Sequence, residues 1–238
     1  MSKVSNSGGN SKAIESNQPG IHEKLEQIVA KHLSHEFEKP FQAHTVEVFS
    51  ELDKEVKSFA GPVILDACCG VGQSTRILAK LYPDALVIGV DKSAHRINRN
   101  VEEHLPQELT ENSNYRLVRA DLNDFYRLVT KAKWPVAKHY ILYPNPWPKA
   151  KHVQRRWHGS AVFPFIVNIG EQLILRSNWS LYLEEFQLAA EMAGRVGKMA
   201  EVTDEASTAP LTPFEAKYIA SGQSVWQLSF NNKAQEMV

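Results

Sequence analysis

The chain has 238 residues, of which 43% are hydrophobic, and it carries 27 acidic and 27 basic side chains. This composition predicts one medium-sized domain with an ample core, plus an appendage. A formal net charge of zero excludes a strongly basic or acidic protein, and no apolar run is long enough to span a membrane.

Two segments precede the main domain. Residues 1–20 are rich in Ser, Asn and Gly and predict a disordered tail. Residues 21–60 predict a helical extension, because apolar residues recur at helical spacing from Ile21 to Leu33 and again from about Ala43 to Ser58. The main domain is expected to cover residues 61–238.

The main domain alternates short apolar strands with helices. Strands are expected at Val63–Ala67, Leu86–Val90, Tyr115–Arg119, Tyr140–Tyr143, Gln172–Arg176 and Ser224–Asn231. Helices are expected at Ser74–Tyr82, Ala94–His104, Leu122–Ala132, Ser160–Gly170 and Leu181–Met192. This alternation predicts an α/β fold with a doubly wound, mostly parallel sheet covered on both faces. Such sheets bind ligands beyond the C-terminal ends of their strands.

The only two cysteines, Cys68 and Cys69, are neighbours. Adjacent cysteines rarely form a disulfide with each other, which favours a reduced, cytoplasmic protein. The N-terminus lacks the apolar core of a signal peptide. Cysteine and histidine do not recur at zinc-binding spacings, so no metal site is expected. The oligomeric state is open, with a monomer favoured.

The first expected strand runs into a loop with the sequence Asp66-Ala67-Cys68-Cys69-Gly70-Val71-Gly72-Gln73-Ser74-Thr75. Gly70 and Gly72 allow a sharp turn and a close approach of the backbone to a ligand. The loop is partly similar to a dinucleotide fingerprint, but Thr75 replaces its third small residue, which disfavours an NAD-dependent dehydrogenase. Asp66 would repel a pyrophosphate and attract a cationic ligand.

Two further carboxylates follow the next two strands. Asp91 ends the second strand, where a carboxylate can accept hydrogen bonds from two ribose hydroxyls. Asp121 follows the third strand and would suit the amino group of adenine. Each carboxylate alone is more often a helix cap or a turn residue, but three at successive strand ends predict a site for a positively charged nucleoside. S-adenosylmethionine fits this description, because it has adenine, ribose, an ammonium and a sulfonium but no phosphate.

The fourth strand leads into Tyr143-Pro144-Asn145-Pro146-Trp147-Pro148-Lys149. Its three prolines predict a stiff, exposed loop, which is either a plain surface turn or the place where a methyl acceptor meets the cofactor. Asn145 would orient a planar base, and Trp147 would stack on it or pack as a lid. No Asp or Glu occurs from Phe125 to Gly170, which predicts a one-sided basic patch. The candidates for holding phosphates are Lys149, His152, Arg155 and Arg156.

These residues resemble those of the bacterial tRNA (guanine-N7-)-methyltransferases, which have the class I S-adenosylmethionine-dependent fold. The resemblance runs from about Val63 to Phe230. The loop at Asp66–Gly72 and Asp91 are generic to class I methyltransferases. Two blocks are more specific: Pro144–Lys149 with His152 and Arg155-Arg156 behind it, and Thr212-Pro213-Phe214-Glu215-Ala216-Lys217 near the C-terminus.

The resemblance implies a seven-stranded sheet, S-adenosylmethionine as cofactor and tRNA as substrate. The cofactor would be bound by Asp66, Gly70, Gly72, Asp91, Asp121 and Asn145. Asn145 would lie at the reaction centre, and Glu215 would recognise the amino or ring N–H edge of guanine. The tRNA guanine and its surroundings would be contacted by Trp147, Lys149, His152, Arg155, Arg156, Asn178, Thr212, Phe214 and Glu215.

The chain departs from the family pattern at three positions. Cys68 stands where the family usually has the first glycine of its loop, and Asn145 and Asn178 stand where it usually has Asp. Guanine N7 carries no proton, so its methylation needs no base, and a nearby carboxylate would stabilise the cationic product. Asparagine keeps the hydrogen-bond acceptor but loses that charge. Two alternatives therefore stay open: a methyltransferase of the same fold with another acceptor, such as an exocyclic amine or a non-RNA substrate, and a catalytically silent RNA-binding protein.

Overall fold

Seven strands form one sheet in the computed structural model, which describes residues 10–102, 113–203 and 210–231. The strands are β1 (Val63–Ala67), β2 (Leu86–Asp91), β3 (Tyr115–Arg119), β4 (Val136–Leu142), β5 (Gln172–Ser177), β6 (Gly197–Glu201) and β7 (Trp226–Phe230). They lie in the order β3-β2-β1-β4-β5-β7-β6, and β7 is antiparallel to both of its neighbours. The predicted α/β fold with a mostly parallel, seven-stranded sheet is confirmed.

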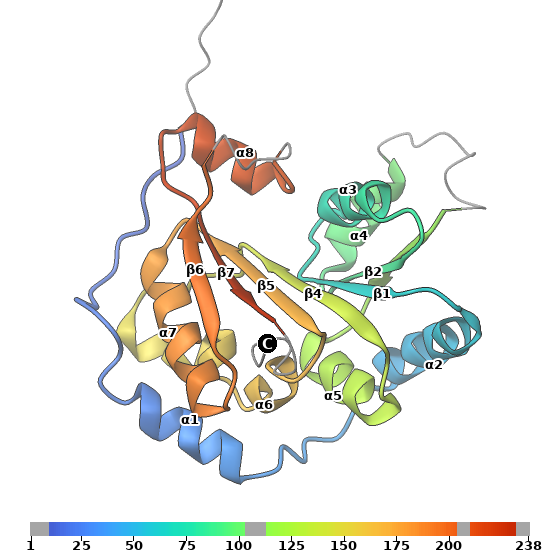
Figure 1. The fold of residues 1–238 in the computed structure, drawn as a ribbon, viewed down its shortest axis with the longest axis horizontal. Coiled ribbons are helices and arrows are strands. Elements are labelled where there is room, and N and C mark those ends of the chain that lie inside the picture. The colour runs from blue at the N-terminus through green and yellow to red at the C-terminus, as the bar shows by residue number, and fades with distance from the viewer. Residues whose placement is uncertain (1–9, 103–112, 204–209, 232–238) are drawn as a thin grey trace, which may run out of the picture.

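Helices cover both faces of this sheet. They are α1 (Leu25–Ser34), α2 (Ala43–Ser58), α3 (Gln73–Leu81), α4 (Ala94–Glu102), α5 (Leu122–Ala132), α6 (Phe163–Ile166), α7 (Ser180–Met192) and α8 (Pro213–Ala220). Figure 1 shows α3, α4 and α8 on one side of the sheet and α5, α6 and α7 on the other. The two N-terminal helices add to the second layer, because α1 packs against α7 and α6 and α2 packs against α5.

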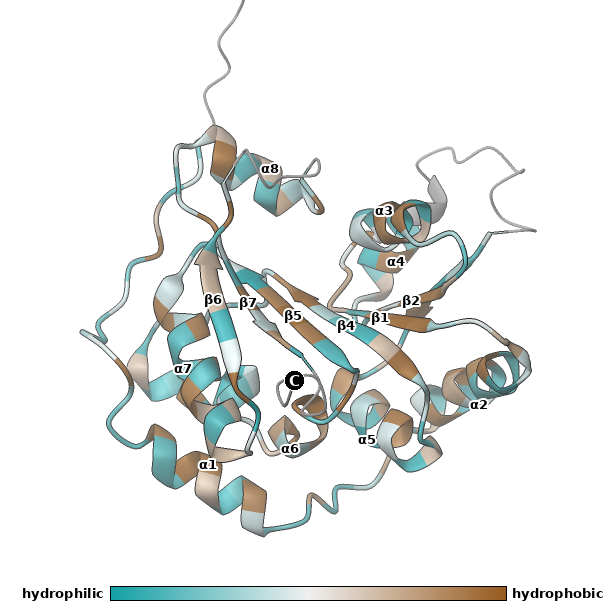
Figure 2. Cartoon of the chain, viewed as in Figure 1, coloured by the Kyte–Doolittle hydropathy of each residue, from teal (hydrophilic) through white to brown (hydrophobic). Residues whose placement is uncertain are grey.

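The central strands are apolar because they are covered on both faces. β1 and β2 are buried over their whole length, which explains why they lack the alternation of a half-exposed strand. In Figure 2 both strands are mostly brown, whereas the edge strand β6 carries teal segments. The larger core lies between the sheet and the layer of α1, α2, α5, α6 and α7, and its fully buried rings include Phe125, Phe163, Phe186 and Phe230.

Several elements differ from the sequence-based expectations. The helix expected at Ser160–Gly170 is shortened to α6, and short 3₁₀ helices at Ala150–Arg155 and Trp157–Gly159 precede it. β4 begins at Val136 rather than at Tyr140, because its first half is only partly buried and lacks an apolar run. β6 and α8 were not predicted, since neither carries a clear apolar pattern and β6 is largely exposed. The last residues of the helix expected at Ala94–His104 lie outside the described residues.

The segment predicted as a disordered tail differs from the structure where it is described. Residues 1–9 lie outside the described residues, but Ser11, Ser16, Asn17 and Gln18 hydrogen-bond the main domain. Gln18, for example, is only 8% exposed and hydrogen-bonds Glu185 of α7. Composition could not predict this placement, because the polar side chains of the segment find partners more than a hundred residues away in the chain.

The parallel strands end at one edge of the sheet. β1 pairs with β2 through Ala67 and Val90, and β2 pairs with β3 through Asp91 and Arg119. On the other side of β1, β4 pairs with β5 through Leu142 and Arg176. The loops that follow β1 to β5 therefore start side by side, which brings together the candidate residues that are far apart in sequence.

Candidate active site

The loop after β1 turns sharply through backbone conformations that favour glycine. Gly70 and Gly72 have φ values of 62° and 76°, in the left-handed region. A Cβ at Gly72 would lie 2.5 Å from a methyl carbon of Leu117, so this position has no room for a side chain. A Cβ at Gly70 would meet no atom within 4 Å, so the loop faces open space there. A ligand can thus approach the backbone at Gly70.

Cys68 has a left-handed backbone conformation, which glycine usually adopts. Its φ is 63°, and a left-handed residue other than glycine costs about 1–3 kcal/mol of strain. The half-buried side chain packs against the core, which offsets part of that strain. Burial raises the pKa of the Cys68 thiol to about 12, with the charge of Asp91 acting in the same direction. The thiol is therefore protonated near neutral pH and does not serve as a nucleophile.

Asp66, at the end of β1, is a buried carboxylate with one free oxygen. Its Oδ2 atom accepts hydrogen bonds from the hydroxyls of Ser74 and Thr75, each at 2.6 Å. Its Oδ1 atom is buried and has no hydrogen-bond partner within the described residues. Burial raises the pKa of Asp66 to about 6, and the hydrogen bonds from Ser74 and Thr75 act against that rise. A bound ammonium would satisfy the free oxygen, which fits the predicted cofactor.

The raised pKa of Asp66 predicts a pH dependence of cofactor binding. The ionised carboxylate attracts an ammonium and the protonated form does not, so affinity for S-adenosylmethionine should fall as the pH drops through about 6. The expected limiting slope is about tenfold in dissociation constant per pH unit. The free energy of unfolding changes in the opposite direction. Because the pKa of Asp66 is raised in the folded state, the protonated carboxyl stabilises the fold below about pH 3.8, and this contribution is lost as the pH rises through about 6.

Isothermal titration calorimetry across this pH range would test the prediction. Asp66→Asn should flatten the binding profile, and substitution of the exposed Asp84 to Asn should leave it as in the wild type. A wild-type affinity that does not change between about pH 5 and pH 7.5 would contradict the assignment of Asp66.

Asp91, at the end of β2, holds the turns on both sides of it. Asp91 is only 2% exposed. Its Oδ1 accepts a hydrogen bond from the Ser93 backbone N–H at 2.8 Å, and its Oδ2 accepts one from the Gly70 backbone N–H at 3.1 Å. Arg96, whose side chain is exposed, also lies 3.3 Å from Oδ2. Asp91 is thus fixed beside the open face of the glycine loop, where its position suits a ribose.

Asp121 is the N-cap of α5. Its Oδ1 accepts a hydrogen bond from the Asn123 backbone N–H at 2.9 Å, and its own N–H donates to the Thr45 hydroxyl at 3.1 Å. The side chain is half-buried. The structure gives Asp121 the capping role, and its contact with adenine stays a prediction.

The loop after β4, residues 144–149, is called the acceptor loop below. Asn145 is exposed, and its Oδ1 accepts a hydrogen bond from the Trp147 backbone N–H at 3.3 Å. Tyr143 and Trp147 have φ values of 51° and 45°, so the backbone is strained on either side of Asn145. Such strain is common where a loop must hold a functional side chain in place.

The basic segment behind the acceptor loop is partly exposed. Arg155 lies over the Trp147 ring, with its guanidinium carbon 4.8 Å from the ring centroid. His152 meets the same ring edge-on at 5.5 Å. Slight burial and the charge of Arg155 lower the pKa of His152. Lys149, Lys151 and Arg155 are exposed, so these cations and the face of Trp147 together offer a surface for a base and for phosphates.

Arg156 corrects the sequence-based expectation that it holds RNA. Its side chain is 0% exposed and forms an ion pair with Glu185, which is also 0% exposed. Its Nε and Nη2 atoms donate to the Trp147 carbonyl at 3.2 and 3.1 Å. Arg156 therefore positions the acceptor loop from below. A buried partner on α7 can neutralise a cation in a basic run, and sequence spacing alone does not show this.

The block at residues 212–215 forms the start of α8. Thr212 is the N-cap, and its hydroxyl accepts from the Glu215 backbone N–H at 3.0 Å. Glu215 is 1% exposed; its Oε1 accepts from Arg176 Nη1 at 2.6 Å, and its Oε2 has no partner within the described residues. Phe214 is 55% exposed. Of the three predicted substrate-binding residues in this block, Thr212 therefore has a structural role as a helix cap and Glu215 has one as the partner of Arg176.

Asn178, in the turn after β5, is held by the turn that follows α8. Its Nδ2 donates to Oε1 of Gln223 at 2.9 Å. Its neighbour Trp179 lies beneath Arg156, whose guanidinium carbon is 5.0 Å from the Trp179 ring. The residues missed from sequence are the supporting ones: Glu185, Gln18, Arg176 and Gln223 hold the candidates in place, and no motif marks them.

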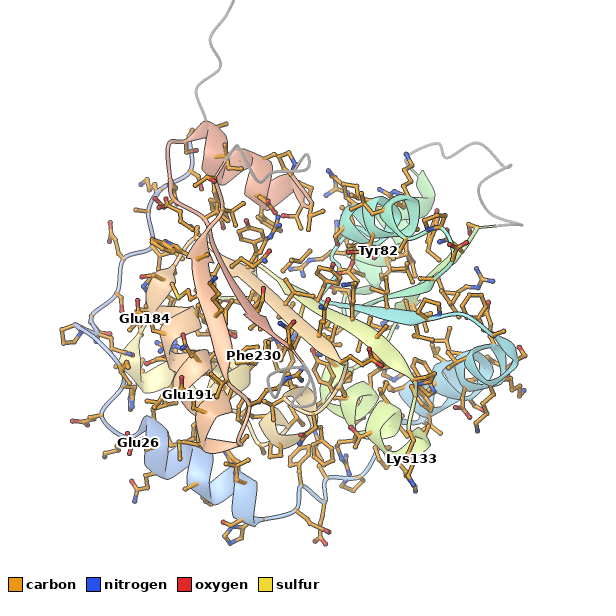
Figure 3. The ribbon with its side chains drawn as sticks, in the orientation of Figure 1. Glu26, Tyr82, Lys133, Glu184, Glu191 and Phe230 are labelled. Carbon is orange, nitrogen blue, oxygen red and sulfur yellow. The ribbon has the colours of Figure 1, made fainter. Side chains whose placement is uncertain are left out.

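A separate groove lies on the sheet face beside α3, over β4, β5 and β7. Its volume is about 410 Å³, and Lys138, Tyr140 and Arg176 line its floor. Figure 3 labels two more lining residues, Tyr82 at the end of α3 and Phe230 of β7. The carboxylates Asp66, Asp91 and Asp121 do not line it, so it is not the cofactor site. Within the described parts of the chain, no helix is long and apolar enough to cross a membrane, and no cluster of three metal-ligating side chains occurs.

Comparison with known proteins agrees with this arrangement. Residues 60–228 match the family described as "Putative methyltransferase". The chain is 24% identical over 176 residues to the tRNA (guanine-N(7)-)-methyltransferase of Thiobacillus denitrificans, covering 72% of this chain and 76% of that protein. It is 29% identical over 178 residues to the protein of the same name from Lysinibacillus sphaericus, covering 70% and 78%.

Solved structures with the same fold include the 16S rRNA methyltransferase KamB, with a TM-score of 0.56 and 16% identity, covering 81% of this chain and 94% of that one. An antibiotic-related methyltransferase matches with a TM-score of 0.54 and 16% identity, covering 76% and 92%. The predicted resemblance is confirmed at low identity. Because the family match spans well over half of its length, the chain belongs to this methyltransferase family.

Proposed function

We propose that the protein transfers a methyl group from S-adenosylmethionine to tRNA and forms 7-methylguanosine. The observation that supports this most strongly is the meeting of two features at one edge of the sheet: the carboxylate-lined glycine loop after β1 and β2, and the exposed acceptor loop after β4. The relatives named tRNA (guanine-N(7)-)-methyltransferase support the choice of acceptor.

The residues after β1 and β2 fit the cofactor. Gly70 leaves open space for a ligand, and Asp66 Oδ1 is a buried acceptor without a partner. Asp91 is fixed beside the glycine loop by hydrogen bonds from the backbone N–H groups of Gly70 and Ser93. When bound, S-adenosylmethionine supplies an electrophilic methyl group. Asp66 would hold its ammonium, Asp91 its ribose and Asp121 its adenine.

The acceptor loop would hold the base for in-line attack. Guanine N7 carries a lone pair and no proton, so this chain needs no general base, and positioning supplies most of the rate. Asn145 would orient the guanine through its amide, and Trp147 would stack on an adjacent base, worth roughly 1–3 kcal/mol. Lys149, Lys151 and Arg155 would bind phosphates, so affinity should fall steeply with salt.

The experiment that tests this proposal uses tRNA from a strain that lacks 7-methylguanosine. After incubation with the protein and S-adenosylmethionine, the tRNA is digested and its nucleosides are measured by mass spectrometry. We expect 7-methylguanosine. A nucleoside methylated at an exocyclic amine would support the alternative acceptor, which the amide of Asn145 favours. Binding of tRNA without any methylation would support the alternative of a catalytically silent RNA-binding protein.

Restoring the missing carboxylate should raise activity. Asn145→Asp keeps the acceptor for the Trp147 N–H and adds a negative charge beside the cationic product. We expect the turnover number for guanine-N7 methylation to rise about tenfold, equivalent to roughly 1.4 kcal/mol of transition-state stabilisation. Steady-state kinetics with tRNA would measure this.

Asn178→Asp is the matched comparison, because Asn178 lies outside the acceptor loop. It donates its amide N–H to Gln223, and a carboxylate at that position cannot donate. We therefore expect Asn178→Asp alone to give no gain. An unchanged turnover for Asn145→Asp would indicate that the acceptor atom is not guanine N7.

With tRNA as its substrate, we expect the protein to work in the cytoplasm. The predicted monomeric state stays a prediction.

A further inference from the structure

The N-terminal residues 11–18, called the strap below, bind the acceptor loop from outside. The Ser16 hydroxyl donates to the Pro148 carbonyl at 2.6 Å. Asn17 Oδ1 accepts from the Ala150 backbone N–H at 3.0 Å, directly after the loop. Two neighbouring strap residues therefore hold the end of the acceptor loop by hydrogen bonds that span more than a hundred residues of sequence.

Gln18 connects the strap to the buried pair beneath the loop. Its Nε2 donates to Glu185 Oε1 at 2.5 Å, and its Oε1 accepts from Arg156 Nη2 at 3.1 Å. The same Arg156 Nη2 donates to the Trp147 carbonyl. Glu185 Oε1 also accepts from the His22 backbone N–H at 2.8 Å, just after the strap. The position of Trp147 thus depends on a network in which Gln18 satisfies both members of a buried ion pair.

The start of the strap contacts the turn that follows α8. The Ser11 backbone N–H donates to the Ser221 hydroxyl at 3.0 Å, and the Ser11 carbonyl accepts from Gln223 Nε2 at 2.9 Å. Gln223 in turn accepts from Asn178. One short segment therefore joins the end of α8, the turn after β5 and the acceptor loop.

We propose that the strap is a positioning element for methyl transfer, in which Asn17 and Gln18 set the orientation of the acceptor loop. This inference rests on the proposed function. The strap hydrogen-bonds the acceptor loop and Ala150 behind it, the buried pair, and the turn after α8, and these partners do not include Asp66, Asp91 or Gly70. Loss of strap contacts should consequently impair the transfer step and leave cofactor affinity intact.

Asn17 provides the sharpest test because a conservative variant exists. Asn17→Ala removes the acceptor for the Ala150 N–H, whereas Asn17→Asp keeps an oxygen of the same reach. Gln18→Leu removes both buried hydrogen bonds at similar size. The control is Glu15→Gln, an exposed strap residue. For each variant we would measure kcat and KM for tRNA, the Kd for S-adenosylmethionine, the thermal midpoint, and hydrogen exchange of residues 144–156.

We expect kcat to fall about tenfold in Asn17→Ala and in Gln18→Leu, since misplacement of a base by about 1 Å can cost up to a hundredfold in rate. The Kd for S-adenosylmethionine should stay within about twofold, and Asn17→Asp and Glu15→Gln should behave as the wild type. The amide of Ala150 should exchange faster in Asn17→Ala.

Two results would overturn the inference. One is wild-type kcat and wild-type exchange of residues 144–156 in both Asn17→Ala and Gln18→Leu. The other is a parallel loss of cofactor affinity and thermal midpoint, which would make the strap a general structural support. If the wild type fails to methylate tRNA, the proposed function fails, but the hydrogen-exchange comparison still decides whether the strap positions the loop.

Discussion

Arg156→Ala should destabilise the fold by about 3–5 kcal/mol, whereas Arg155→Ala, one residue away, should change stability by less than about 0.5 kcal/mol. Removing the guanidinium of Arg156 leaves the buried carboxylate of Glu185 without its charged partner and the Trp147 carbonyl without its two donors. Arg155 is exposed and contacts only the face of Trp147 among the interactions described for it.

When RNA binding is measured, Arg155 should be the arginine whose charge contributes directly. Arg155→Ala should weaken tRNA binding roughly three- to tenfold and lower the dependence of log affinity on log salt by about one unit. Chemical denaturation gives the stability difference, and filter binding over a salt series gives the affinity difference.

Acid should also weaken the Arg156 network. Burial opposes ionisation of Glu185, but the hydrogen bond from His158 and the charge of Arg156 hold its pKa at about 2. Because this pKa lies below the ordinary value of 4.5, the ionised Glu185 stabilises the fold above that pH, and its contribution is lost as the pH falls toward 2.

Equal stability of the Arg156→Ala and Arg155→Ala variants would contradict the roles assigned to these two arginines.

Asp91→Asn should reduce affinity for S-adenosylmethionine about 10- to 100-fold. The substitution removes the charge that would accept the ribose hydroxyls, and hydrogen bonds to charged groups are worth about 1.5–3 kcal/mol each. It also weakens the acceptor for the Gly70 N–H at 3.1 Å, which shapes the glycine loop. The affinity would be measured by isothermal titration calorimetry at fixed pH and salt.

Asp84→Asn is the matched control for this measurement. Asp84 is an exposed carboxylate just before the start of β2, whereas Asp91 is the last residue of the same strand. It should keep wild-type affinity. An Asp91→Asn variant that binds the cofactor as tightly as the wild type would remove Asp91 from the cofactor site.

The central strands were the most predictable part of this molecule. β1, β2 and the middle of β5 are short apolar runs, and parallel strands that are covered on both faces have this pattern. The positions of the carboxylates Asp66 and Asp91 were predictable for the same reason. Each lies at the end of its strand, and parallel strands end at the same edge of the sheet. The exposed position of Asn145 also follows from the prolines around it.

Residues whose role depends on a distant partner were not predictable. Arg156 belongs to a basic run that reads as one surface, and only the fold shows that Glu185 of α7 lies beneath it. Gln18 lies in a segment whose composition indicates disorder, yet it is buried against the same pair. β6 lacks an apolar pattern because it lies at the edge of the sheet and is mostly exposed.

The most direct test of the central claim is the methylated-nucleoside content of unmodified tRNA after incubation with methyl-labelled S-adenosylmethionine, compared between the wild type and Asp91→Asn. We predict labelled 7-methylguanosine with the wild type and a strongly reduced amount with Asp91→Asn at the same cofactor concentration. Absence of labelled 7-methylguanosine with the wild type, or equal amounts with both proteins, would contradict the account.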